Sequence, residues 1–122
     1  MQFMTETEAN CRAREILDRV GDKWSVVVLY QLSTGTMRFT ELLRAIPGIS
    51  QRMLTVTLRG LERDGLVRRT VHPVIPPHVD YDLTPLGETL REIVSALLDW
   101  THEHLEEIGR ARDSYDAGVP TG

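Results

Sequence analysis

The sequence contains one cysteine, Cys11, so no disulfide can form within the chain. Paired cysteines are typical of proteins from oxidising compartments, and their lack favours a reducing one. The longest uninterrupted apolar run is Val26–Tyr30, far short of the roughly 20 residues that a membrane span needs. The first residues have neither the basic leader nor the apolar segment of a secretory signal. These absences predict a cytoplasmic protein with no membrane partner.

The residue sets that mark common enzyme classes are also lacking. We find no serine–histidine–aspartate set, no glycine-rich phosphate loop and no paired carboxylates in a recognisable setting. His102 and Glu106 lie four residues apart on a predicted helix and could both contact one metal ion. No further ligand accompanies them, so a solvated helix face is the simpler interpretation. We therefore expect no enzymatic activity, no cofactor and no metal site.

Positive charge is scarce overall but concentrated in the middle of the chain. The sequence has 14 basic and 18 acidic side chains, for a net charge of −4. Residues 35–72 nevertheless contain seven arginines against three acidic residues, whereas residues 73–122 are strongly acidic. A positive central block with acidic flanks is typical of a surface that binds a polyanion. A solvated arginine face is the alternative that charge alone leaves open.

The length of 122 residues favours one domain, and we assign it to residues 11–112. Residues 1–10 are predicted to be a flexible N-terminus and residues 113–122 a flexible tail. Hydrophobic periodicity between them predicts five helices and two strands, with a further short strand at residues 37–38. The helices are expected over residues 12–20, 23–33, 39–46, 50–64 and from 85 to beyond 108, and the strands over 66–72 and 79–83. This is an α+β chain, mostly α.

The boundaries of these elements rest on specific signals. The valines of residues 26–28 would favour a strand by propensity, but the spacing of Trp24, Val28 and Leu32 favours a helix. Pro47 and the glycine after it end one helix, and Ser50 is placed to cap the next. Threonine followed by proline at residues 84–85 starts the last helix. Helices followed by a hairpin and a final helix form the winged helix-turn-helix plan.

The helix over residues 50–64 has two contrasting faces. Its inner face is predicted to contain Met53, Leu54, Thr57, Leu58 and Leu61. Its outer face is predicted to contain Arg52, Thr55, Arg59 and Arg63, with Gln51 and Val56 at the edges. Arginine pairs with guanine, glutamine pairs with adenine, and a methyl group contacts thymine, so this face suits a DNA major groove. An arginine-rich surface helix is the alternative, but the preceding turn and following hairpin favour DNA recognition.

Several consecutive stretches of the chain resemble the HxlR-type winged helix-turn-helix transcriptional regulators. The matching stretches are Leu17–Trp24 (LDRVGDKW), Arg38–Ile46 (RFTELLRAI), Pro47–Leu54 (PGISQRML), Leu58–Val67 (LRGLERDGLV) and Val79–Gly87 (VDYDLTPLG). The resemblance covers residues 11–105. It implies a homodimer on an inverted-repeat operator, with the Ser50–Asp64 helix in the major groove. It also implies that the loop Pro73–His78 acts as a wing against the DNA backbone or minor groove.

The resemblance nominates the side chains that contact DNA. On the recognition helix these are Ser50, Gln51, Arg52, Thr55, Val56 and Arg59. Arg38 and the wing residues His72 and His78 are expected to contact phosphate.

The last helix is more apolar than packing on one small domain requires. We expect a second copy of the chain to cover the surplus, through N- and C-terminal dimerisation helices. The predicted interface residues are Ile16, Leu17, Leu97, Trp100, Leu105 and Ile108. A longer contact within one chain is the alternative.

Cys11 lies where several members of the resembled family carry a cysteine, which in some of them senses oxidants or electrophiles. At a predicted helix N-terminus beside Arg12 and Arg14, its thiolate would be stabilised. The sequence departs from the family because Arg12 replaces the usual proline. A partly buried structural thiol is the alternative.

The leading hypothesis is a dimeric regulator of transcription, more readily a repressor, that binds double-stranded DNA and responds to a small-molecule or oxidant effector. One alternative is a redox- or electrophile-sensing regulator that acts through Cys11. The other is a winged-helix module that binds proteins and no longer binds DNA.

Overall fold

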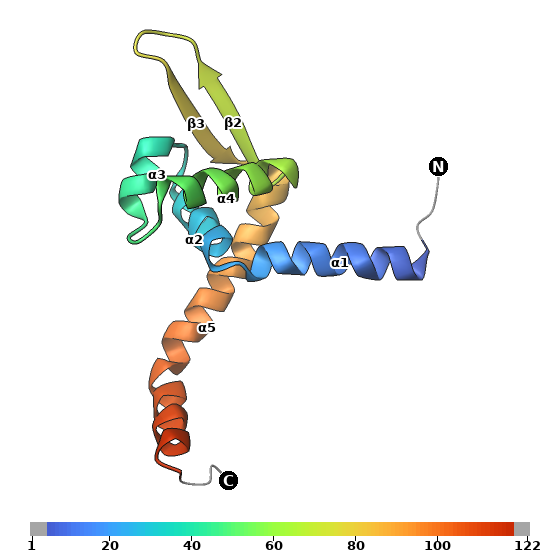
Figure 1. Cartoon of the computed structure of the whole chain (residues 1–122), viewed down its shortest axis with the longest axis vertical. Coiled ribbons are helices and arrows are strands. Elements are labelled where there is room, and N and C mark those ends of the chain that lie inside the picture. Colours follow the sequence, from blue (N-terminus) through green and yellow to red (C-terminus); the bar gives the residue numbers. More distant parts are fainter. Residues whose placement is uncertain (1–4, 119–122) are drawn as a thin grey trace.

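Two long helices extend away from a small packed unit (Figure 1). They are α1 (Glu6–Gly21) and α5 (Pro85–Asp116). The computed structural model describes residues 5–118. The packed unit contains α2 (Lys23–Gln31), a 3₁₀ turn η1 (Leu32–Thr34), β1 (Met37–Arg38), α3 (Phe39–Ala45), α4 (Gln51–Arg63), β2 (Val67–His72) and β3 (His78–Leu83). The predicted mostly helical winged helix-turn-helix fold is confirmed.

The hydrophobic core lies between α2, α3, α4, the base of the sheet and the first part of α5. Its most buried members are Val28, Leu29, Leu32, Leu42, Ile46, Leu54, Leu58, Leu61, Val67 and Val94. The valine-rich segment is helical because this conformation places Val28 and Leu29 together in the core with no exposed surface. Thr57 is also buried, and its hydroxyl has no hydrogen-bond partner within the described part of the chain.

The turn between α3 and α4 follows directly from its sequence. Gly48 adopts a φ of 84°, a left-handed conformation that side chains disfavour. Ile49 is buried and anchors the turn to the core. The backbone N–H of Met53 donates to the Ser50 hydroxyl at 3.0 Å, which confirms Ser50 as the helix cap.

The three strands form an antiparallel sheet in the order β1–β3–β2. β2 and β3 make a hairpin that projects from the packed unit as the wing (Figure 1). Arg68 forms a two-pronged ion pair with Asp82, its partner in the strand register. The hydrogen bond and attraction to Asp82 raise the pKa of Arg68 above its ordinary value.

A tight junction joins α4, β2 and α5. Gly65 leaves α4 with a φ of 77°, and the Thr84 hydroxyl donates to the Gly65 carbonyl at 2.5 Å. The Thr84 N–H donates to the Leu66 carbonyl at 3.1 Å. Gly87 comes so close that an added Cβ would lie 2.0 Å from the Leu66 carbonyl oxygen. Only glycine fits there, so the first turn of α5 rests directly on the chain between α4 and β2.

Three local predictions are wrong. α1 begins at Glu6 and not at residue 12, because Thr5 and Glu8 form a reciprocal capping box. α5 continues through residues 113–116, where a tail was expected. Met53 is 39% exposed, although it was assigned to the inner face of α4. The expected irregular ends at residues 1–4 and 119–122 lie outside the described residues.

Asp22 occupies the cap position of α2, as predicted, but its carboxylate accepts a hydrogen bond from the Ser25 hydroxyl and none from the helix backbone. Among the described residues, no helix combines the length and apolar character that crossing a bilayer requires.

Candidate nucleic-acid interface

The outer face of α4 is open to solvent along its first three turns. Gln51, Arg52, Val56 and Arg59 are exposed, and Thr55 is half-buried among them. These five residues line a shallow depression on the molecular surface. The opposite face of the same helix buries Leu54, Thr57, Leu58 and Leu61. The predicted two-faced helix is therefore present, with its polar face unobstructed.

Two hydroxyls on this helix already have partners. The Thr55 hydroxyl donates to the Gln51 carbonyl at 2.9 Å, which leaves its methyl group and oxygen lone pairs for a ligand. The Ser50 oxygen accepts the Met53 N–H, so its own proton remains available to donate. Guanidinium, amide and methyl groups thus dominate what the face presents.

A groove separates α4 from the wing. It is lined by Thr55, Arg59 and Glu62 from α4, and by Arg69 and Tyr81 from the sheet. Arg69 was not among the predicted contact residues. Strand alternation could have identified it, because Arg69 lies on the same face of β2 as buried Val67, the face turned toward α4.

Some of the arginines form ion pairs with carboxylates and others do not. Arg19, Arg68 and Arg91 form ion pairs with Asp64, Asp82 and Glu88 respectively. Within residues 5–118, Arg38, Arg52, Arg59 and Arg69 have no such pair with a protein carboxylate. The cations around α4 and the groove therefore keep their charge available to an external anion.

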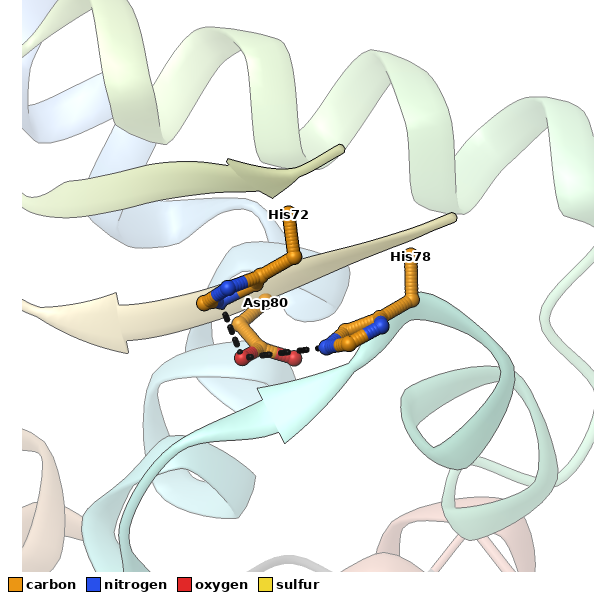
Figure 2. A group of neighbouring side chains, drawn as sticks. All are labelled: His72, His78 and Asp80. Atoms are coloured by element: carbon orange, nitrogen blue, oxygen red, sulfur yellow. Dashed lines mark ion pairs between the residues drawn. The ribbon is translucent and has the colours of Figure 1, made fainter. Parts of the chain in front are cut away.

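The two wing histidines meet at one carboxylate (Figure 2). Nε2 of His72 lies 2.8 Å from Oδ2 of Asp80, and Nε2 of His78 lies 3.9 Å from the same oxygen. The imidazole rings stack with centroids 4.6 Å apart. The nitrogens proposed for phosphate thus face a carboxylate, and the loop tip presents Val74 and fully exposed Ile75.

Sequence reasoning missed Asp80 as a member of this group. The signal lies in the hairpin register, which pairs His72 with His78 and places Asp80 two residues further along the same face. Arg38 lies opposite Asp80 across β1 and β3. The Arg38 backbone N–H donates to the Glu41 carboxylate at 2.9 Å, while its side chain is exposed.

Comparison with known proteins decides the family. The HxlR-like helix-turn-helix family model matches residues 19–109. The chain belongs to the HxlR family. Members of this family are transcriptional regulators and not enzymes, in agreement with the residue sets that the sequence lacks.

Relatives of this HxlR-family chain include proteins described as regulators. It is 48% identical over 103 residues to YtfH of Escherichia coli strain K12, an uncharacterised HTH-type transcriptional regulator. The aligned region covers 84% of this chain and 82% of that protein. Among solved structures it is similar to the redox regulator HypR in its reduced form, with 39% identity and a TM-score of 0.75. That match covers 81% of this chain and 98% of HypR. Diamide-treated YodB from B. subtilis matches with 29% identity and a TM-score of 0.65, covering 84% and 96% of the two chains.

The predicted dimerisation residues of this HxlR-family protein are largely exposed in a single copy. Ile16, Leu17, Leu97, Trp100 and Leu105 have between 51% and 66% of their surface exposed, and Ile108 is half-buried. Leu86 and Ile93 on α5 are equally exposed. They border an apolar groove that Ile16 and Val20 of α1 line from the other side. These residues form what we call the arm surface of α1 and α5.

The local prediction for Cys11 is wrong. Cys11 is exposed, but it lies within α1, five residues after Glu6, and not at a helix N-terminus. The unsatisfied backbone N–H groups of α1 lie in its first turn, ahead of Cys11. Its exposure also excludes a partly buried structural thiol in the single copy.

Proposed function

We propose that this HxlR-family regulator binds an inverted-repeat operator as a homodimer and represses the promoter that it occupies. α4 enters the major groove, and the β2–β3 wing lies against the backbone or minor groove. Base contacts come from Gln51, Arg52, Thr55, Val56 and Arg59, with Ser50 at the helix start. Arg38, His72, His78 and Arg69 lie toward the flanking backbone.

The observation that carries this proposal is the outer face of α4. A helix that is buried on one side and presents Gln51, Arg52, Val56 and Arg59 on the other has the shape and chemistry for base edges. Among the described residues, Arg52 and Arg59 form no ion pair with a protein carboxylate. A guanidinium that is unpaired beforehand loses no ion pair on meeting a guanine or a phosphate.

Arg69 extends the positive surface from α4 to the wing. It shares the groove with Arg59, so one anion passing between helix and sheet would meet both guanidinium groups. Phosphate is that anion in a duplex, and contacts to it position a protein without reading sequence.

A homodimer is supported by the arm surface. The apolar side chains of α1 and α5 are too exposed to serve a single copy, and they run along two helices that leave the packed unit (Figure 1). A two-fold assembly doubles the base contacts and requires half-sites about one helical turn of DNA apart. Occupation of such a site in a promoter blocks transcription, which is why we favour repression.

Fluorescence anisotropy with a duplex from upstream of the protein's own gene tests DNA binding directly. Affinity should fall steeply between two salt concentrations, because phosphate contacts displace counterions. Arg59→Ala should weaken specific binding by about 5- to 150-fold, equivalent to roughly 1–3 kcal/mol. Arg69→Ala should weaken all duplexes alike and reduce the salt slope by about one. Arg110→Ala, on the distal part of α5, is the matched control and should bind as the parent does.

The result that contradicts the proposal is a protein that forms no salt-sensitive complex with any promoter fragment. Such a protein would be a winged-helix module for protein partners. Repression is checked separately with a reporter fused to the bound promoter. A rise in reporter output on expressing the regulator would reverse the assigned sign.

A second candidate function is thiol sensing through Cys11. Cys11 is exposed on α1, the helix that contributes Ile16 and Leu17 to the arm surface. The similar protein HypR is described as a redox regulator. If an oxidant acts here, diamide should produce a cross-linked dimer on non-reducing gels and change DNA affinity, and Cys11→Ser should abolish both. A variant that keeps the response removes Cys11 from the mechanism.

A further inference from the structure

His72, His78 and Asp80 bring three metal-ligating groups to one point on the wing. One ligand atom from each residue lies within 4.8 Å of the other two. The closest pair, His72 Nε2 and Asp80 Oδ2, is 2.8 Å apart. Ligand atoms around a tetrahedral zinc ion are separated by about 3.4 Å, given bonds of 2.0–2.1 Å. Rotations of these partly exposed side chains would bring the three ligand atoms to that spacing.

The strands hold these groups in place. His72 and His78 are the last register pair of the β2–β3 hairpin, and Asp80 follows His78 by two residues. All three side chains therefore project from one face of the sheet. Tyr81, which lines the groove beside α4, projects from the other face. The cluster consequently lies on the side of the wing turned away from the recognition helix.

The neighbouring charges leave the Asp80 carboxylate available. Arg68, on the same face, is paired with Asp82. Arg38 lies opposite Asp80 in the register, yet its guanidinium forms no ion pair with Asp80 within the described chain. The side chains of His78 and Asp80 are 24% and 21% exposed, so the group is partly shielded but reachable from solvent.

We propose that His72, His78 and Asp80 bind one divalent transition-metal ion, with Zn²⁺ as the best match. Two imidazoles and one carboxylate suit zinc, whereas calcium and magnesium prefer oxygen ligands alone. Three protein ligands leave a fourth position for water or another donor. The ion would link β2 and β3 at the ends next to the wing loop and so restrict the conformation of that loop. This site does not include the proposed base contacts of α4, but it shares His72 and His78 with the phosphate contacts proposed for the wing.

Isothermal titration of Zn²⁺ into the full chain, purified without a polyhistidine tag, tests the site. The parent protein should bind one ion per chain, and Co²⁺ in its place should give the visible absorption bands of a tetrahedral complex. His72→Gln and His78→Gln should each weaken binding by at least about tenfold, since even the loss of an outer-shell partner has that effect. Asp80→Asn should weaken it as well.

His102→Gln and Cys11→Ser are the matched controls, because they remove an imidazole and a thiol that lie outside the wing cluster. Both should bind Zn²⁺ as the parent does. Circular dichroism of each variant checks its fold, and the Co²⁺ spectrum and melting temperature of the parent remain informative if a variant fails to fold. The proposal is overturned if the parent shows no saturable binding of one ion per chain. It is equally overturned if binding persists in both wing-histidine variants or disappears in a control.

Discussion

The packed unit buries its apolar residues, whereas the two long helices α1 and α5, which we call the arms, leave most of theirs exposed. α4 has 13 residues and buries four of them, whereas α1 has 16 residues and buries none. α5 is 32 residues long, and its only buried positions are Gly87 and Val94, near its start. The arms nevertheless retain large apolar side chains. Packing within one copy leaves these side chains exposed, which is the physical basis of the proposal that they form an interface.

The largest expected contrast comes from removing one buried and one exposed side chain. Leu58→Ala should lower the free energy of unfolding by about 2–5 kcal/mol, because it leaves a cavity in the packed unit. Tyr115→Ala, at a residue 79% exposed near the end of α5, should change it by less than about 0.5 kcal/mol. Urea denaturation measures both. Equal losses would mean that the end of α5 is packed as tightly as the core.

Two glycines of α5 provide the next contrast. Gly87→Ala should destabilise the protein by about 1–3 kcal/mol, since its Cβ collides with backbone that cannot rotate away. The Cβ added by Gly109→Ala would meet no atom beyond its own helical backbone within 4 Å among the described residues, so this substitution should stabilise the helix by about 0.5–1 kcal/mol. Thermal melting of the pair measures the difference. A stabilising Gly87→Ala would show that α5 does not rest on the junction.

The arm surface itself is tested by Trp100→Ala. A large aromatic residue at the centre of an interface should raise the dissociation constant of the dimer by about tenfold or more. Analytical ultracentrifugation over a concentration series measures this change. Ile75→Ala, at a fully exposed residue of the wing loop, is the control and should leave association unchanged. If neither variant alters association, the arms do not join two copies.

The smallest effect is expected inside the packed unit. Thr57→Val replaces by a methyl group a buried hydroxyl that has no hydrogen-bond partner among residues 5–118, and should raise stability by up to about 1 kcal/mol. Thr55→Val removes a hydroxyl that donates to the Gln51 carbonyl, so no such gain is expected. Chemical denaturation of the two variants compares them. A loss of stability in Thr57→Val would indicate that its hydroxyl has a partner, such as a buried water.

Much of the packed unit could be predicted because its signals are local. Ser50 caps the helix that it precedes, and the spacing of Leu54, Leu58 and Leu61 alone defines the buried face of α4. The start of α1 was missed even though Thr5 and Glu8 have the spacing of a capping box, because no apolar pattern follows immediately.

The histidine–aspartate cluster could not be found in the same way. His72 and His78 meet only when the hairpin adopts one register, and that register depends on the conformation of the connecting loop. Arg69 differs, because strand alternation places it on the same face of β2 as buried Val67. The histidine–aspartate cluster depends on the pairing of two strands, which the periodicity of a single strand does not specify.

The close fit of Gly87 against Leu66 has a geometric consequence for any two-fold assembly. This contact holds the start of α5 against the end of α4. In a two-fold dimer joined through α5, the distance between the two α4 helices would therefore depend on how the two α5 helices pack. A shift of one helix past the other by a single turn would change the offset between the two α4 helices by up to about 5.4 Å. That displacement exceeds the roughly 3.4 Å rise of one base pair. Operator spacing would then be encoded in a surface that never touches DNA.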